Sequence, residues 1–159
     1  MSTDADNGQK GFGALARYLR DHSWKAERMQ DETAFKARKE GDLCPLLYYF
    51  QVKTELQQFL FYIVPEIDLF QDMVPPVGEF VCRANHGMRI GSFELDWRSG
   101  RLSFKSSLNF KGVELSPILI DNTIQPALTA FDEFFPGAAR VIAGLDTPAD
   151  AIRKIEYGE

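Results

Sequence analysis

Apolar residues recur at helical spacing in the first part of the chain and again near its middle. Phe12, Leu15 and Leu19 mark the spacing within residues 11–22 and predict an amphipathic helix there. A second helix is expected to begin at Pro75 and Pro76, since proline is tolerated in a first helical turn. Its apolar stripe consists of Val77, Phe80, Val81, Ala84 and Met88.

A third helix is predicted to begin at Ser116 and Pro117, which supply a capping hydroxyl followed by proline at the first helical position. Pro126 lies inside its apolar stripe and should kink or break the helix. Residues 135–137, Phe-Pro-Gly, predict a second break before a short helical segment at 141–145. A last turn or two is expected in residues 149–156.

The remaining stretches favour strands. Residues 24–29 and 34–38 predict two short, charged, edge-like strands joined by a polar turn at 30–32. Residues 46–53 and 56–64 are rich in Tyr, Phe, Val, Ile and Leu, which suit a pleated sheet. Residues 90–97 and 101–110 predict a further pair around a turn at 98–100. The order of elements indicates an α+β fold, with an antiparallel sheet and flanking helices.

The strand at 56–64 is apolar on both faces, because Phe59, Phe61 and Ile63 alternate with Leu60, Tyr62 and Val64. An antiparallel sheet in a small monomer usually leaves one face in water. A strand that is apolar on both sides is therefore expected to be covered twice. Either two parts of this chain cover it, or a second protein chain covers one face.

The pair of strands at 90–97 and 101–110 predicts one apolar and one polar face. Phe93, Leu95 and Trp97 are expected to share the apolar face. On the polar face, Glu94 and Asp96 of one strand come near Arg101 and Lys105 of the next, the pairing typical of a solvated sheet face. A functional charged patch is the alternative interpretation.

The 159-residue length predicts one domain. We expect a disordered tail over residues 1–10, an α+β domain over 11–146 and a C-terminal helical tail over 147–159. The composition is 45% apolar and 13% aromatic, as in globular proteins. A net charge of −5 and a pI near 5.1 argue against nucleic acid or an anionic membrane as the main partner.

The chain carries no signal of export or membrane insertion. Its N-terminal sequence is polar, without the basic and apolar regions of a signal peptide. The longest apolar runs are far shorter than the ~20 residues of a spanning helix. Cys44 and Cys82 form no disulfide framework and are interpreted as reduced structural thiols. These features favour a cytoplasmic protein.

No group of residues predicts catalysis, a metal or a cofactor. His22, His86, Cys44 and Cys82 are spread along the sequence without the spacing of a metal site. His22 is followed by Ser23, but no third residue is indicated to orient such a pair. Glu94 and Asp96 could act as paired carboxylates, yet strand residues at this spacing are usually solvated. Asn85 is expected to cap a helix or turn, and Gly91 to permit close packing. We therefore predict that the chain is not an enzyme.

Several segments resemble the YbjN family of bacterial proteins. They are G-S-F-E-L-D at 91–96 with the preceding Asn85, R-L-S-F-K-S-S-L at 101–108, F-D-E-F-F-P-G-A-A-R-V-I-A-G at 131–144, and the tail T-P-A-D-A-I-R-K-I-E at 147–156. The match runs from about residue 11 to 156, although residues 24–75 match only in pattern. The resemblance implies the fold of type III secretion chaperones, with element order α-β-β-β-α-β-β-α and room for one more N-terminal strand. Such chaperones are commonly dimers that bind extended protein segments, and members of the family are labelled sensory transduction regulators.

We therefore expect a non-enzymatic protein-interaction module, chaperone-like or regulatory, that binds a protein segment or forms a homodimer. The physical basis would be apolar sheet surface together with unpaired strand backbone. The candidate interaction residues are Tyr48, Tyr49, Phe50, Phe59, Phe61 and Tyr62. A small-molecule sensor is the alternative; it would need an apolar pocket with a few converging polar groups. A hydrolase would need a buried histidine or carboxylate with a shifted pKa.

Overall fold

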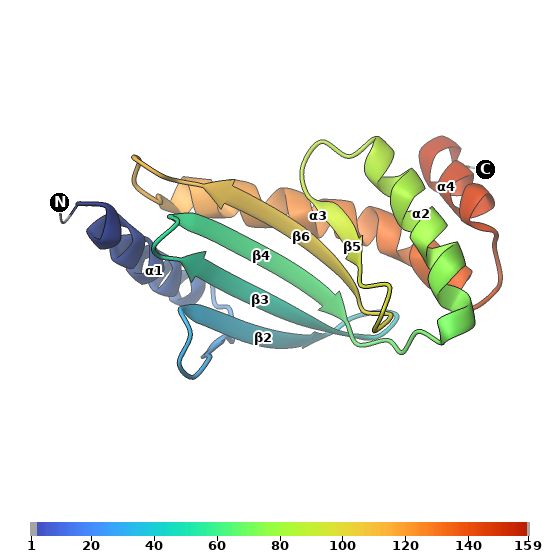
Figure 1. Cartoon of the computed structure of the whole chain (residues 1–159), viewed down its shortest axis with the longest axis horizontal. Helices are drawn as coiled ribbons and strands as arrows, with labels where there is room; N and C mark the ends of the chain where they lie inside the picture. Colours follow the sequence, from blue (N-terminus) through green and yellow to red (C-terminus); the bar gives the residue numbers. More distant parts are fainter. Residues whose placement is uncertain (1–2, 159) are drawn as a thin grey trace.

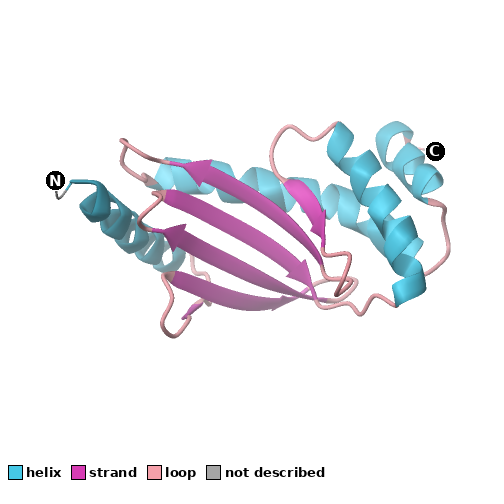
Figure 2. Cartoon of the chain, viewed as in Figure 1, coloured by secondary structure: helices cyan, strands magenta, loops and turns pink. Residues whose placement is uncertain are grey.

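The computed structural model describes residues 3–158. Over this range the chain forms one six-stranded sheet and four α-helices (Figures 1 and 2). The helices are α1 (Thr3–Asp21), α2 (Val74–His86), α3 (Pro117–Ile142) and α4 (Pro148–Tyr157), with a short 3-10 helix η1 (Gln71–Met73) before α2. The strands are β1 (Glu27–Arg28), β2 (Ala34–Glu40), β3 (Pro45–Lys53), β4 (Gln58–Pro65), β5 (Ser92–Leu95) and β6 (Leu102–Asn109).

The sheet has the order β1-β2-β3-β4-β6-β5, and every neighbouring pair is antiparallel. This arrangement confirms the predicted α+β class. The further N-terminal strand that the sequence left open is present as the two-residue β1. In Figure 1 the sheet lies in front of α1 and α3, while α2 and α4 stand together beyond one end of it.

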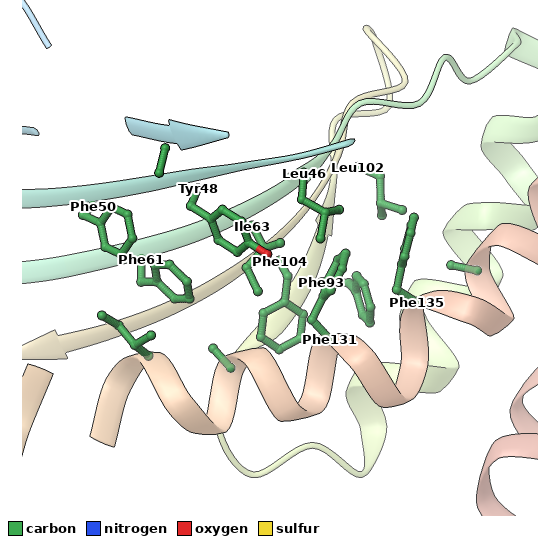
Figure 3. Close-up of a cluster of buried hydrophobic side chains, with 14 of the residues drawn as sticks. Leu46, Tyr48, Phe50, Phe61, Ile63, Phe93, Leu102, Phe104, Phe131 and Phe135 are labelled. Atoms are coloured by element: carbon green, nitrogen blue, oxygen red, sulfur yellow. The ribbon is translucent and has the colours of Figure 1, made fainter. Parts of the chain in front are cut away.

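The core extends to the buried faces of α2 and α4, and its main part lies between the sheet and the helices α1 and α3. Side chains alternate along β3 and β4, so every second residue points toward these helices. Figure 3 shows the aromatic part of this core, in which Phe93 of β5 packs edge-on against Phe104 of β6 at 5.0 Å. Phe131 of α3 lies next to both rings. Burial of each such side chain contributes about 1.5–3 kcal/mol to the stability of the fold.

Helix α1 begins earlier than the sequence indicated. It starts at Thr3, so residues 3–10, expected to be a disordered tail, are helical; residues 1 and 2 of that expected tail lie outside the described residues. Gly8 is buried against the backbone of Thr54 in the turn between β3 and β4. The Asn7 amide donates hydrogen bonds to Gln57 Oε1 at 2.6 Å and to the Val113 carbonyl at 3.0 Å. These contacts supply tertiary packing for the polar first turns of the helix.

Helix α3 is continuous, and the breaks predicted at Pro126 and at residues 135–137 are wrong. Both Pro126 and Pro136 lie inside the helix. The predicted start is confirmed, because the Ser116 hydroxyl accepts a hydrogen bond from the Leu119 N–H. A proline inside a helix costs about 3 kcal/mol. The buried stripe of α3 along the sheet offsets that cost, which local sequence pattern alone does not show.

Strand β5 is shorter than the predicted strand at 90–97. The chain leaves the sheet after Leu95, and Asp96 begins a tight turn in which its carboxylate accepts hydrogen bonds from the Arg98 N–H and the Ser99 hydroxyl. Trp97 therefore does not share the apolar face with Phe93. Its indole is 60% exposed and lies against Gly78 of α2.

Candidate protein-interaction surface

The sheet has one face that no helix covers in Figure 1. Its centre is formed by the side chains of β3 and β4 that point away from the core. We call this surface the open face and define it by Leu47, Tyr49, Gln51, Leu60, Tyr62 and Val64. Val64 is buried among its neighbours and the other five are half-buried. Five of the six are apolar or aromatic, and Gln51 is the exception, so the face is unusually hydrophobic for a solvated sheet.

Two tyrosines occupy the middle of the open face. Tyr49 on β3 and Tyr62 on β4 are direct cross-strand neighbours. The same row continues to Lys36 on β2 and to Lys105 on β6. Adjacent tyrosines form an amphipathic contact area with few rotatable bonds, and tyrosine is enriched in protein interfaces.

Charged pairs border this row of side chains. Lys105 forms an ion pair with Glu94 of β5, and the carboxylate raises the pKa of the Lys105 ammonium. On the opposite side, Arg38 of β2 pairs with Glu66 at 2.7 Å and with Glu40 at 2.8 Å, and both carboxylates raise the pKa of the guanidinium. The predicted cross-strand pairing of acidic and basic residues is thus present for Glu94 and Lys105.

The structure divides the six candidate interaction residues between the two faces. The side chains of Tyr48, Phe50, Phe59 and Phe61 are 0–5% exposed and belong to the core. Figure 3 shows Tyr48, Phe50 and Phe61 on the side of the sheet that faces α3. Tyr49 and Tyr62 point to the open face. A protein that bound the open face would therefore contact the two tyrosines, whereas the other four residues support the sheet from behind.

A groove of about 430 Å³ runs over the open face. Its floor includes Tyr49, Tyr62 and Val64. The groove is also lined by Glu32 from the β1–β2 turn and by Arg101, which directly precedes β6. From the sequence, Arg101 was predicted only to lie on a solvated sheet face. Glu32 was predicted only to lie in the turn at 30–32. Neither residue could be assigned to a groove, because their proximity depends on how the sheet twists.

The two edges of the sheet differ from the open face. At β5, the Asn85 side-chain amide forms hydrogen bonds with both main-chain groups of Phe93. It donates to the Phe93 carbonyl at 3.0 Å and accepts from the Phe93 N–H at 2.8 Å. Asn85 was expected to cap a helix or turn; its side chain instead fastens α2 to an edge strand. At the other edge, β1 pairs only with Phe35 and Lys36 of β2. The rest of β2 carries charged residues, which discourage strand addition.

Among the residues considered for catalysis, His22, Glu94 and Asp96 have other partners. His22 Nδ1 lies 2.9 Å from the Tyr18 carbonyl, and its ring stacks on Tyr18. His86 is exposed at the end of α2. Glu94 pairs with Lys105, and hydrogen bonds from Ser99 and Arg98 lower the pKa of the Asp96 carboxyl. Each interaction accounts for the residue as part of a turn, helix end or strand pair.

Two further kinds of site are absent from residues 3–158: metal-ligand clusters and membrane-spanning helices. No group of three or more His, Cys, Asp or Glu side chains there is placed to hold a metal ion. None of the helices in the described part of the chain is long and apolar enough to cross a membrane. Cys44 and Cys82 are both unpaired thiols, and burial raises the pKa of Cys44. Gly91 has φ +74°, and a Cβ there would lie 2.5 Å from the Phe104 ring, in agreement with the predicted close packing.

The fold and this surface define an α+β domain whose sheet is covered by helices on one side and open on the other. The family model that matches residues 13–140 is that of YbjN, described as "Putative bacterial sensory transduction regulator". The chain belongs to the YbjN family. This membership indicates a regulatory role. No protein of curated function matches the chain.

Proposed function

We propose that the chain is a non-enzymatic regulatory module of the cytoplasm that acts through protein contacts on the open face, first of all by pairing with a second copy of itself. The observation that carries the proposal is the tyrosine-centred groove on a sheet face without a helix. Burying such a face against another protein removes apolar area from water, the main driving force of association.

Charge at the groove favours a second copy as the partner. Glu32 and Arg101 both line it and carry opposite charges. A twofold axis that crosses the groove at a right angle can place Glu32 of each copy near Arg101 of its partner. Such an isologous interface uses the same pair of contacts twice. The charges then fix the register of the pair, while the tyrosines supply most of the buried area.

The face is a better candidate than the sheet edges. Strand addition requires unpaired N–H and C=O groups on an edge strand. Asn85 already occupies those of Phe93 on β5, and charged side chains flank the unpaired part of β2. A chaperone-like partner, an extended segment of another protein, would therefore be expected in the groove across the open face.

The solution mass tests this proposal. Light scattering over a tenfold range of concentration should give twice the 18.0 kDa of one chain. Arg101→Glu and Glu32→Arg should each shift the pair toward monomer, because each places like charges together. The double variant should restore the pair. Arg98→Glu changes an exposed charge in the same hairpin outside the groove and serves as the control.

A mass of 18.0 kDa at every concentration would overturn self-association. Failure of the double charge swap to restore pairing would overturn the proposed register. If the chain is a monomer, a capture experiment that compares Tyr62→Ala with wild type would test whether the open face binds another protein.

A further inference from the structure

A second hollow lies on the opposite, helix-covered side of the sheet. It is a cleft of about 520 Å³ between the β2–β3 turn and α3, a size within the range of small-molecule sites. Its apolar walls are formed by Trp24, Leu46, Tyr48, Leu128, Phe131 and Phe135. These side chains come from the segment after α1, from β3 and from α3, so the cleft exists only in the folded chain.

Ring contacts hold the walls in place. The Trp24 ring packs edge-on against Tyr48 at 5.1 Å and against Phe50 at 5.0 Å. On the α3 side, Phe131 and Phe135 stack at 4.7 Å with an interplanar angle of 15°. Figure 3 shows the rings of Tyr48, Phe131 and Phe135 between the sheet and α3. A ligand entering the cleft meets aromatic groups that are already ordered, which lowers the entropic cost of binding.

Tyr48 brings a polar group into this apolar environment. Its side chain is 5% exposed and lines the cleft, and its hydroxyl makes no hydrogen bond to any other residue of the described chain. Burial, together with the negative charge of Asp132 nearby, raises the pKa of Tyr48 and keeps the phenol protonated. The neutral hydroxyl is available to a ligand as donor or acceptor.

The charge at the cleft is mainly negative. Glu40, Asp42 and Asp132 line it, against one cation, Lys39. Glu40 is paired with Arg38, which leaves Asp42 and Asp132 to set the sign. Asp132 lies on α3 directly after Phe131, so its carboxylate borders the aromatic wall.

We infer that this cleft binds an organic ammonium ion with an apolar or aromatic body. The body would lie between Trp24 and the Phe131–Phe135 stack, and the ammonium would reach Asp132 and the Tyr48 hydroxyl. Aromatic faces attract cations, and the carboxylate adds a charge-assisted hydrogen bond. An anionic ligand of the same shape would meet Asp42 and Asp132 and be repelled.

This site is separate from the proposed protein interface, because Tyr48 and Tyr49 are consecutive residues of β3 that point to opposite faces. The inference about ligand binding in this cleft therefore does not depend on self-association. The two sites would still be connected through β3, because a ligand would contact Tyr48 and a protein partner would contact Tyr49.

The test uses 2-phenylethylamine, with 3-phenylpropionate as the anion of similar shape and ethylamine as the cation without an aromatic body. The chain has two tryptophans, so Trp97→Phe leaves Trp24 as the only indole reporter. In that background, titration with 2-phenylethylamine should shift Trp24 emission in a saturable manner and raise Tm. The other two compounds should do so at least tenfold more weakly.

Asp132→Asn should weaken binding of the amine by about tenfold, as expected for loss of a charge-assisted hydrogen bond. Glu133→Gln is the matched control, since Glu133 is the exposed neighbour on α3 and lies outside the cleft lining; it should leave binding unchanged. Tyr48→Phe should weaken binding while the far-ultraviolet spectrum stays native. Absence of a saturable shift, equal binding of 3-phenylpropionate, or equal effects of Asp132→Asn and Glu133→Gln would overturn the inference.

Discussion

The side-chain amide of Asn85, in the last turn of α2, forms two hydrogen bonds with the main chain of Phe93 in β5. In effect a side chain takes the place of a neighbouring strand for one residue. It joins α2 to the sheet and occupies the backbone groups through which another chain could add to β5. The first prediction follows from this double contact.

Asn85→Ala is expected to lower the free energy of unfolding by about 1–3 kcal/mol, because both partly buried backbone groups of Phe93 lose their partner. Urea denaturation measures the loss. Asn122→Ala on the exposed side of α3 is the control and should change stability little. If the two variants lose the same stability, the hydrogen bonds contribute nothing beyond an ordinary surface asparagine.

Two glycines of α1 provide a test of its docking. A Cβ on Gly8 would overlap the backbone of Thr54, whereas a Cβ on Gly13 would have only Arg17 Nη1 within 4 Å, at 3.6 Å. We expect Gly8→Ala to destabilise the protein by about 1–3 kcal/mol through overpacking. Gly13→Ala should stabilise it by about 0.5–1 kcal/mol through helix propensity. The measurement is Tm by thermal unfolding of the two variants. A higher Tm for Gly8→Ala would mean that the start of α1 does not pack against Thr54.

Local periodicity was sufficient to predict most of the fold. The alternation in residues 46–53 and 56–64 led directly to β3 and β4, and the stripe after Pro76 to α2. The errors occurred where tertiary packing outweighs local preference. Pro126 does not end α3, because the helix packs along the sheet. The polar start of α1 is ordered by Asn7 and Gly8, whose partners are 46 or more residues away.

The open face was predictable only in part. Alternation separates Tyr48 from Tyr49 and Phe61 from Tyr62, but it does not say which set the helices cover, since both sets are hydrophobic. That choice depends on the path of α1 and α3. The places of Glu32 and Arg101 in the groove depend on turns and sheet twist, for which the sequence carries no periodic signal.

Tyr18 links α1 to α3 through a hydrogen bond from its hydroxyl to Asp121 at 2.6 Å. Burial and the carboxylate raise the pKa of Tyr18 to about 12. Below the ordinary value of about 10 the phenol is neutral in both folded and unfolded chains, and its contribution to stability is complete. That contribution should be lost as pH rises from about 10 through about 12. An ultraviolet titration compared with Tyr18→Phe measures this ionisation; a phenol that titrates near pH 10 would contradict it.

Asp146 connects α3 to α4, because its carboxylate accepts hydrogen bonds from Arg140 Nε at 2.5 Å and Lys154 Nζ at 2.8 Å. Its side chain is 6% exposed, and these two cations lower the pKa of the carboxyl to about 2. The folded chain thus holds this proton more weakly than the unfolded chain, so the contribution to stability is complete above about pH 4. It should be lost as pH falls from about 4 through about 2.

Asp146→Asn should remove this part of the acid dependence, and the difference in unfolding free energy between wild type and variant should shrink across the same interval. Urea denaturation at a series of pH values measures the difference. Arg140→Ala is the companion variant: it removes the first of the two cations and should raise the pKa of Asp146 toward its usual range, as followed by carboxyl NMR titration. A constant difference from pH 5 to pH 2 would mean that the carboxylate does not hold α4 against α3 through its charge.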